Sequence, residues 1–320
     1  MDEQRLATTL CGIRLNNPVL AASGTFGYGI EFEKLVDLNQ LGGIVTKGLS
    51  REPMRGNPAP RLWHTEAGMI NSVGLQNIGV AAFIREKLPK LGKYSVPVFA
   101  NVFGYAIEDY LEVIRALEDA EGLAGYELNV SCPNTKKGGM FFSSDPALVF
   151  DLVARLRSAA RRPLIVKLSP NVARIEPFAV AAEQAGADAI SLVNTFVALA
   201  IDVNTGSARI GAGMGGLSGP AIRPLALRLV YEAAQTVKIP VIGLGGISSG
   251  KDALEFLLAG ASAVQVGTAT FVDPRAPTIV AAQLAGVLRK MGVPDLERLP
   301  GRFQLKPAAA PQPSQAPIAK

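Results

Sequence analysis

The stretch LIVKLSPNVARIEPFAVAAEQAGADAISLVNT, residues 164–195, decides the expected fold. A continuous apolar run, Leu164–Ser169, is followed by an amphipathic segment, Ile175–Ala185, and then by a second apolar run, Ala189–Thr195. Strands that are covered on both faces read as continuous apolar runs, whereas apolar positions at helical spacing indicate a helix. Gly186 stands where such a helix would end. The stretch therefore predicts a strand, a helix and a second strand.

The same alternation recurs along the chain. The candidate strands are Val19–Ser23, Gly43–Gly48, Val96–Val102, Tyr126–Ser131, Leu164–Ser169, Ala189–Thr195, Val241–Gly246 and Ala263–Thr268. The clearest helical patterns between them are Ile107–Ala120, Pro146–Ala160, Ile175–Ala185, Ile222–Val237 and Gly250–Ala259. Eight strands alternating with helices predict an α/β fold, a (β/α)8 TIM barrel. A doubly wound open sheet is the alternative, and it is disfavoured because the early strands lack a following G-x-G-x-x-G motif.

The remaining segments complete the expected organisation. Residues 1–18 are expected to form a short N-terminal hairpin that plugs the barrel floor. Residues 49–78 are rich in Pro, Gly and Asn and predict an elaborated loop on the catalytic face. We expect a single barrel domain over residues 1–306 and a disordered Ala/Pro-rich tail over residues 307–320, whose composition cannot build a core.

Composition limits the possible functions. Of the 320 residues, 48% are hydrophobic and 18% are charged, a balance typical of a soluble globular enzyme. The net charge of +5 comes from scattered Lys and Arg, which argues against nucleic-acid binding. Two cysteines, Cys11 and Cys132, provide no disulfide framework or zinc cluster, so we expect no metal and a reducing compartment. Residues 1–18 lack a secretory signal and no run approaches the about 18 apolar residues of a membrane span, so a cytoplasmic location is expected.

Polar or small residues recur where the predicted strands end, which is where TIM barrels carry their chemistry. A single Asn or Ser at such a point is commonly turn chemistry, but coincidence at all eight ends is hard to sustain. A lysine that ends a buried strand is costly without an anionic partner. The strand-end residues are Ser23, Lys47, Asn101, Asn129, Lys167, Asn194 with Thr195, Gly245 with Gly246, and Gly267 with Thr268.

The last two strand ends predict a phosphate site. Small residues before a helix start let backbone N–H groups approach a phosphate, and the loops after strands seven and eight are the usual barrel phosphate site. Together with Lys47 and Lys167, this pattern favours a phosphorylated planar cofactor such as FMN, and Lys167 could stabilise negative charge on its reduced ring. The asparagines at 71, 101, 129 and 194 suit a flat, amide-rich ligand, because an amide side chain both donates and accepts hydrogen bonds.

The segment Asn129-Val-Ser-Cys132-Pro-Asn134-Thr-Lys-Lys137-Gly-Gly139 joins a strand end, a thiol and a glycine-bearing loop. A thiol there could exchange a proton with a substrate, and the loop could close over it. A small buried thiol beside an ordinary turn is the alternative.

Taken together, these motifs resemble the dihydroorotate dehydrogenase family over roughly residues 5–303. The resemblance rests on the Cys132 segment, Asn71-Ser-Val-Gly-Leu-Gln-Asn77, Gly215-Gly-Leu-Ser-Gly-Pro220 and the two glycine loops. A cysteine rather than a serine at position 132 is similar to class 1. Lys136-Lys137-Gly138-Gly139 and Gly24-Thr-Phe-Gly-Tyr-Gly29 resemble the class 1B (type B) catalytic subunit.

The resemblance implies FMN-dependent oxidation of (S)-dihydroorotate to orotate in pyrimidine biosynthesis, with one FMN per chain. It implies that Cys132 is the general base that removes the C5 proton, while the C6 hydride passes to flavin N5. The substrate residues implied are Lys47, Asn71, Ser72, Val73, Gly74, Leu75, Asn129, Asn194 and Thr195. The FMN residues implied are Ser23, Lys47, Gly48, Asn101, Asn129, Lys167, Val193, Gly219, Gly245, Gly246, Gly267 and Thr268.

Class 1B also implies a partner subunit that carries FAD and a [2Fe–2S] cluster and passes electrons to NAD⁺, within a heterotetramer around a homodimer core. Two cysteines in this chain cannot supply the four ligands such a cluster typically takes. The alternatives are a class 1A-like homodimer that reduces fumarate, an FMN-binding barrel without turnover, and covalent attack by Cys132 on the substrate.

Other polar residues are expected to be structural. His64, the only histidine, is expected at the surface, and Cys11 is expected to be a small buried hydrophobe. Asp37, Glu118 and Asp119 are expected to be solvated charges on helix faces.

Overall fold

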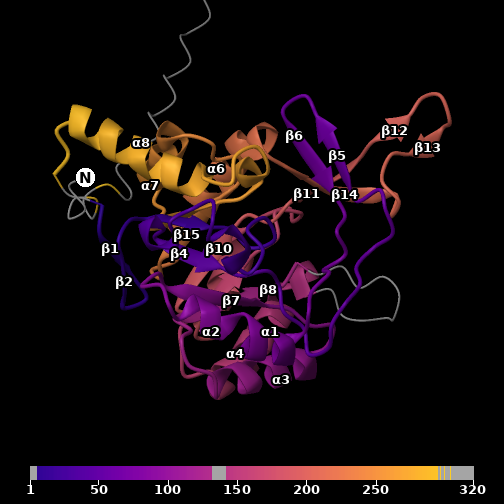
Figure 1. Ribbon diagram of the computed structural model, residues 1–320, viewed down its shortest axis with the longest axis horizontal. Helices are drawn as coiled ribbons and strands as arrows, with labels where there is room; N and C mark the ends of the chain where they lie inside the picture. The colour runs from indigo at the N-terminus through magenta and orange to yellow at the C-terminus, as the bar shows by residue number, and fades with distance from the viewer. Residues whose placement is uncertain (1–5, 132–141, 295, 297–298, 300–302, 304–320) are drawn as a thin grey trace, which may run out of the picture.

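The computed structural model describes residues 6–131, 142–294, 296, 299 and 303 (Figure 1). Its centre is a closed barrel of eight parallel strands, which confirms the predicted TIM fold. In chain order the barrel strands are β3 (Val19–Ala21), β4 (Gly43–Val45), β7 (Val98–Val102), β8 (Gly125–Asn129), β9 (Leu164–Lys167), β10 (Ala189–Leu192), β15 (Val241–Leu244) and β16 (Ala263–Val266). Each lies within a predicted strand or begins one residue before it.

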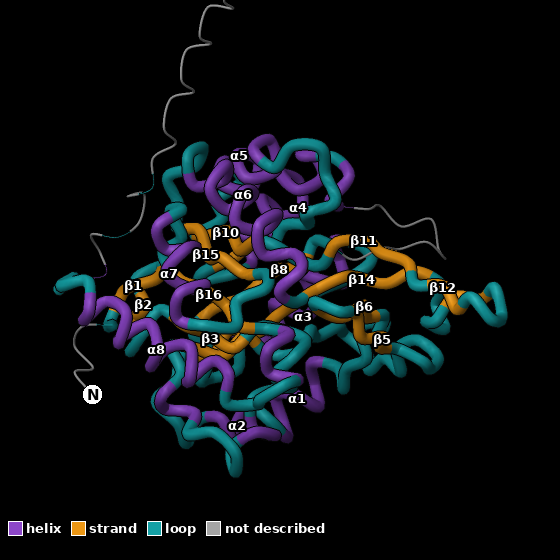
Figure 2. Tube along the Cα trace, turned by 90° about the horizontal axis from the view of Figure 1, so that it is seen from above, coloured by secondary structure: helices purple, strands orange, loops and turns teal. Residues whose placement is uncertain are grey.

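Helices surround the barrel (Figure 2). They are α1 (Val80–Glu86), α2 (Leu88–Leu91), α3 (Ile107–Glu118), α4 (Pro146–Ala159), α5 (Glu176–Gln184), α6 (Arg223–Ala234), α7 (Gly250–Leu258) and α8 (Ala276–Lys290). Short 3-10 helices cover Ile30–Phe32, Leu38–Gln40, Phe142–Ser144, Pro220–Ile222 and Thr268–Phe271. The predicted start of α4 is confirmed, since Asp145 accepts a hydrogen bond from the Ala147 N–H and Pro146 follows it. Gly186, with φ of 94°, follows α5 as predicted.

The part of the barrel interior nearer the amino ends of the strands is apolar. Leu20, Val45, Phe99, Ile165 and Ile242 are fully buried there. The N-terminal hairpin of β1 (Thr8–Leu10) and β2 (Ile13–Leu15) packs Leu10 and Leu15 into the same cluster. The predicted plug of the barrel floor is therefore confirmed.

The barrel interior becomes polar one layer further along the strands. Side chains two residues apart on a strand point to the same side. Asn101 therefore follows Phe99, and Lys167 follows Ile165, into the interior. The buried polar side chains of this layer are Asn101, Glu127, Lys167, Ser191 and Gln265. This polar layer lies beneath the carboxyl ends of the strands and forms the floor of the barrel mouth.

A second sheet was not predicted. It consists of β5 (Leu62–Thr65), β6 (Gly68–Asn71), β11 (Phe196–Leu199) and β14 (Met214–Ser218), paired antiparallel in the order β11-β14-β6-β5. The region predicted as an elaborated loop, residues 49–78, thus contributes a hairpin. Because β11 follows β10 directly, the sheet begins at the carboxyl end of the barrel (Figures 1 and 2). A small ribbon, β12 (Ile201–Asp202) with β13 (Ser207–Ala208), extends beyond it.

Among the described residues, no helix has the length and apolar character that crossing a bilayer requires.

Candidate active site

Two of the predicted asparagines meet at the barrel mouth. Asn194 Nδ2 donates to Asn129 Oδ1 at 3.2 Å, and the backbone N–H of Ser131 donates to the same oxygen at 3.2 Å. The Asn194 Oδ1 atom accepts from the Thr195 N–H at 2.8 Å. The Asn129 carbonyl accepts from the hydroxyl of buried Tyr110 at 2.8 Å, which fixes the end of β8. The barrel thus brings Asn129 and Asn194 together from two strand ends.

Lys167 and Asn101 lie below them, in the polar layer. Both contact the carboxylate of Glu127, with Asn101 Nδ2 donating at 2.8 Å and Lys167 Nζ lying at 3.6 Å. The Lys167 side chain is only 8% exposed, and Glu127 is fully buried. A lysine that is buried at the end of a strand needs an anionic partner, and for Lys167 that partner is Glu127.

The predicted phosphate loops form a tight cradle. A Cβ at Gly246 would lie 2.8 Å from the carbonyl oxygen of Gly219, and both glycines have positive φ, 75° and 93°. Only glycine lets the two backbones approach in this way. Thr268 adjoins the cradle, because its Oγ1 donates to Ser218 Oγ at 2.8 Å. Val193 lies beside Gly245, where a Cβ would approach the Val193 side chain to 3.3 Å.

Buried Asp252 holds the loop that follows Gly246. Its carboxylate accepts from the N–H groups of Ser248 and Ser249 at 3.0 and 2.9 Å, from Ser248 Oγ at 3.0 Å, and from Arg223. Ser249 in turn caps the first turn of α7. The loop conformation is therefore fixed by the protein itself.

The second sheet brings the Asn71 segment to the mouth. Asn71 pairs with Gly216 across β6 and β14, and its Nδ2 donates to the Gly216 carbonyl at 3.2 Å. The space beside Gly216 is filled by the Thr195 side chain, which a Cβ at Gly216 would overlap. Asn71 and Thr195 therefore meet at one glycine. Ser72 Oγ accepts from Asn57 Nδ2 at 2.8 Å.

The remaining predicted residues of this segment and of the first two strands also lie near the mouth. Leu75 has a positive φ of 57°, and its carbonyl accepts from Asn77 Nδ2 at 2.9 Å. Val73 and Gly74 pack against residues 56 and 57 of the same loop. Ser23 and Gly48 follow the adjacent strands β3 and β4, and Gly48 lies beside the Asn101 side chain. Gly267 directly follows β16.

Lys47, at the end of β4, is half-buried. Burial lowers the pKa of its ammonium, and the nearby positive charge of Arg61 lowers it further, against the opposing effect of Glu31. Arg61 is itself held by Gln76 Oε1 at 2.6 Å and by the Arg55 carbonyl at 2.9 Å. A positively charged region therefore flanks the mouth, and it favours anionic ligands.

The polar residues fit a phosphorylated planar group such as FMN. The glycines of the cradle bring two backbone segments together beside the strand ends, and the buried side chain of Lys167 lies beneath the mouth. Gln265 Oε1 is buried and has no hydrogen-bond partner among the described residues. Cys132 and the loop of residues 133–139 lie outside the described residues, so the predicted base is not part of this geometry.

Three residues of the polar layer were missed by sequence reasoning: Glu127, Ser191 and Gln265. The signal available for Glu127 was an acidic residue inside an apolar strand, which must be paired when buried. The expectation for Glu118 was wrong, because it is 9% exposed and accepts hydrogen bonds from Arg161 Nε and the Arg161 N–H, both at 2.9 Å.

Cys11 is half-buried rather than buried, and its Sγ donates to the Asp188 carbonyl at 3.4 Å. His64 is exposed, as expected, and its ring stacks on that of Trp63.

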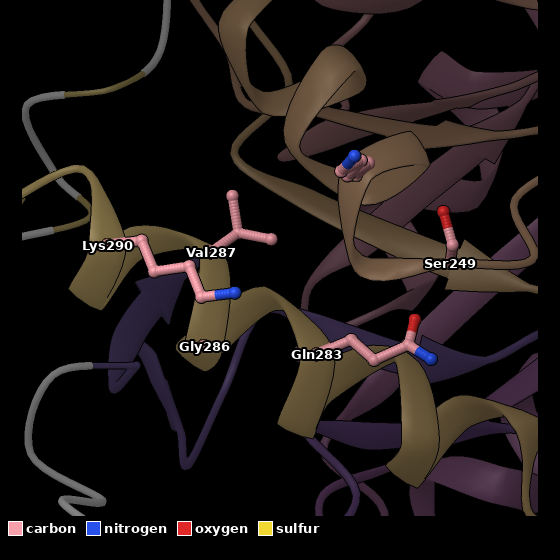
Figure 3. Close-up of a pocket in the computed structure, with 6 residues that line it drawn as sticks. Ser249, Gln283, Gly286, Val287 and Lys290 are labelled. Carbon is pink, nitrogen blue, oxygen red and sulfur yellow. The ribbon is translucent and has the colours of Figure 1, made fainter.

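A surface groove lies apart from this site. It has a volume of about 410 Å³ and lies between α7 and α8 (Figure 3), lined by Ser249, Lys251, Gln283, Gly286, Val287 and Lys290. None of these is a predicted site residue, and the groove is on the outer helical layer. The barrel mouth is therefore the candidate active site. In the described part of the chain, no group of three or more His, Cys, Asp or Glu could hold a metal ion.

Fold and site together define a TIM-barrel protein with a cluster of polar side chains at the carboxyl ends of its strands. The family model for dihydroorotate dehydrogenase matches residues 5–288. The chain belongs to the dihydroorotate dehydrogenase family and is an enzyme of that family, which confirms the resemblance.

Individual relatives extend over nearly the whole chain. A putative dihydroorotate dehydrogenase A (fumarate) from Solibacter usitatus is 68% identical over 289 residues, 90% of this chain and 95% of the relative. The catalytic subunit of dihydroorotate dehydrogenase B (NAD(+)) from Geotalea uraniireducens is 49% identical over 301 residues, 94% of this chain and 99% of the relative. The corresponding subunit from Geobacter metallireducens is 48% identical over 305 residues, 95% of this chain and 100% of the relative.

Proposed function

We propose that the chain catalyses the FMN-dependent oxidation of (S)-dihydroorotate to orotate, a step of pyrimidine biosynthesis. The observation that carries the proposal is the arrangement of three groups at the barrel mouth. The Asn129–Asn194 pair lies one layer above the buried Lys167, and the Gly219–Gly246 cradle lies at neighbouring strand ends. Membership of the dihydroorotate dehydrogenase family supports the substrate.

FMN would be held by residues from most strands of the barrel. The cradle of Gly219, Gly245 and Gly246, with Gly267 and Thr268, would bind its phosphate through backbone N–H groups. When bound, FMN supplies the two-electron acceptor for the hydride that leaves C6 of the substrate. Lys167 would hold a positive charge near the ring, where negative charge grows on reduction. The other residues proposed to contact FMN are Ser23, Lys47, Gly48, Asn101, Asn129 and Val193.

Cys132 would remove the C5 proton as general base. A free thiol has a pKa of about 8.5, so a fraction is already thiolate near neutrality, and a nearby cation would enlarge that fraction. Dihydroorotate then loses a proton to the sulfur and a hydride from C6, and the C5–C6 double bond of orotate forms. Covalent attack by Cys132 is the alternative, and mass spectrometry of the denatured protein after turnover would detect the adduct.

The substrate is a small cyclic acid with two amide N–H groups and several carbonyl oxygens, and its ring becomes planar when the C5–C6 double bond forms. Asn71, Asn129 and Asn194 offer amide groups that both donate and accept, and Thr195 adds a hydroxyl. Lys47 would bind the carboxylate, and the backbone of residues 72–75 would line the ring edge. The contacts that support this proposal join Asn71 and Thr195 at Gly216, and Asn194 to the Asn129 side chain.

For the final acceptor we propose NAD⁺, reached through a partner subunit that carries FAD and a [2Fe–2S] cluster, in a heterotetramer built on a homodimer of this chain. The relatives named as catalytic subunits of the NAD(+) enzyme support this reading. A second candidate is direct reduction of fumarate by a homodimer, which the 68% identical relative named for fumarate favours. A cytoplasmic location would keep the Cys132 thiol reduced.

An acceptor assay separates these readings. The purified chain is mixed with dihydroorotate and either fumarate or NAD⁺, with and without an electron-transfer subunit that carries FAD and a [2Fe–2S] cluster. Turnover with NAD⁺ that requires the second subunit supports the proposal. Rapid turnover of the isolated chain with fumarate supports the second candidate. A colourless protein with no affinity for FMN would indicate a barrel without this activity.

A further inference from the structure

Glu127 lies in the middle of β8, inside the barrel, and its two carboxylate oxygens have four side-chain partners. Oε1 accepts from Asn101 Nδ2 at 2.8 Å and lies 3.6 Å from Lys167 Nζ. Oε2 accepts from Ser191 Oγ at 2.9 Å and from Gln265 Nε2 at 2.6 Å. The partners come from four different strands, so one carboxylate joins β7, β9, β10 and β16 to β8.

Stability alone does not account for this carboxylate. Burying a charge is costly, and well-packed apolar residues of similar volume often stabilise a protein at least as well as a buried ion pair. The lower interior layer of the same barrel is built in that way, from residues such as Phe99 and Ile165. The polar layer is therefore explained better by what Glu127 does to its partners.

One effect of Glu127 is to orient two amide side chains. An ionised carboxylate only accepts hydrogen bonds, so Asn101 and Gln265 must turn their NH2 groups toward it. The Asn101 Oδ1 atom then faces Gly48, where a Cβ would lie 3.0 Å from it. Gln265 Oε1 is left buried without a hydrogen-bond partner among the described residues.

The second effect concerns charge. The Lys167 side chain is 8% exposed, so water screens its charge little, and the carboxylate at 3.6 Å from Nζ offsets much of its field. We propose that Glu127 is a positioning residue that sets the redox equilibrium of the bound flavin, by fixing Lys167 and Asn101 and by partly neutralising the lysine. The inference rests on the proposed function, since it assigns Lys167 to the flavin site.

Glu127→Gln tests the charge while keeping the shape. The substituted carbonyl can still accept from Asn101 and Lys167. The substituted NH2 can donate to Ser191 Oγ. It can also donate to Gln265 Oε1 once the Gln265 amide rotates, because this oxygen has no hydrogen-bond partner among the described residues. We therefore expect this variant to fold and to bind FMN.

The readout is the ratio of reduced to oxidised flavin at anaerobic equilibrium with a reference dye. With the carboxylate neutralised, the field of Lys167 stabilises the reduced, anionic flavin more strongly. The ratio should rise about 10-fold at a fixed dye potential. Flavin reduction by dihydroorotate should become faster, and reoxidation slower. A ratio within twofold of the wild-type value, or below it, would overturn the proposal.

Two control variants separate charge from structure. Ser191→Ala removes one hydrogen bond to Glu127 but no charge, and it should leave the ratio within twofold of wild type. Glu118→Gln makes the same chemical change at the opposite end of the barrel, and it should also leave the ratio unchanged. A Ser191→Ala shift as large as that of Glu127→Gln would make the role merely structural and overturn the proposal.

Lys167→Gln gives a second test that does not depend on the folding of Glu127→Gln. Removing the positive charge should lower the ratio, and a rise would contradict the proposal. The proposed function fails separately, if the wild-type chain binds no FMN. A wild-type protein that is yellow and reducible, with an unchanged ratio in Glu127→Gln, refutes only this inference.

Discussion

Asn194 Nδ2 donates a hydrogen bond to Asn129 Oδ1 across the barrel mouth, between residues 65 positions apart in the chain. The Asn129 Oδ1 atom also accepts from the Ser131 N–H, so this oxygen is used twice within the protein. The Asn129 Nδ2 group donates to no residue in the described part of the chain. The pair thus fixes the orientation of the Asn129 amide at the mouth. The contact forms only because the closed barrel brings the two strand ends together.

We predict that Asn194→Ala weakens substrate binding and retains FMN. The variant loses one amide and releases the orientation of Asn129, a change worth about 1–3 kcal/mol. KM for dihydroorotate should rise roughly 10- to 100-fold, with the flavin spectrum unchanged. Steady-state kinetics and the absorbance spectrum measure both. An unchanged KM would remove Asn194 from the substrate site.

Cys132→Ala should retain FMN and lose most turnover. Removing a positioned base typically costs about 10²–10⁴ in rate, and rapid-mixing measurement of flavin reduction gives that rate directly. Cys132→Ser should keep some activity with a more alkaline optimum, because a hydroxyl is a poorer base. Normal flavin reduction in Cys132→Ala would refute the role of Cys132.

Cys11 provides the matched control for this prediction. Burial raises the pKa of its thiol to about 12, with a further contribution from Asp188, so little thiolate exists at neutral pH. Cys11→Ala should therefore retain activity, and iodoacetamide should modify Cys132 first, as peptide mapping would show.

The phosphate cradle predicts a selective loss in Gly246→Ala. The added methyl would lie 2.8 Å from both the Gly219 carbonyl oxygen and the Arg223 Cβ, at a φ of 75°. The affinity for FMN should fall at least about tenfold, whereas the weaker affinity for riboflavin, which has no phosphate, should change little. Gly286→Ala, in α8 with no atom within 4 Å of the new methyl, should retain FMN affinity and gain about 0.5–1 kcal/mol of stability. An equal loss for FMN and riboflavin would contradict the cradle.

Glu118 predicts a pH dependence of stability. Burial alone would raise its pKa, but hydrogen bonds from Arg161, Tyr126 and Arg162 lower it from 4.5 to about 2. A carboxylate whose pKa is lower in the folded state stabilises the fold above the unfolded value, and this stability is lost as pH falls from about 4.5 toward 2. Because Arg161 is largely exposed, we expect Glu118→Gln to cost about 1–2 kcal/mol near pH 7. Denaturant unfolding of both proteins between pH 7 and 3 tests this, and a constant difference over that range would contradict it.

The barrel could be predicted from sequence because each barrel strand is buried on both faces and reads as an apolar run. The second sheet could not, since Met214–Ser218 contains two glycines and pairs with Gly68–Asn71, which is distant in the chain. Such pairing depends on the folded barrel rather than on a local pattern.

The same distinction holds within the site. Strand-end residues were predictable, because the carboxyl ends of parallel strands converge. The role of Glu127 was not, because one of its partners, Gln265, lies 138 positions away. Glu118 was misjudged for the same reason, since Arg161 lies 43 positions away.

Anaerobic titration of the purified chain with dihydroorotate, followed by absorbance, tests the proposed oxidation without any partner subunit. We expect a yellow protein with about one FMN per chain, whose flavin absorbance bleaches as orotate forms in equal amount. A protein that binds FMN but keeps its full absorbance with excess dihydroorotate would contradict the proposed oxidation.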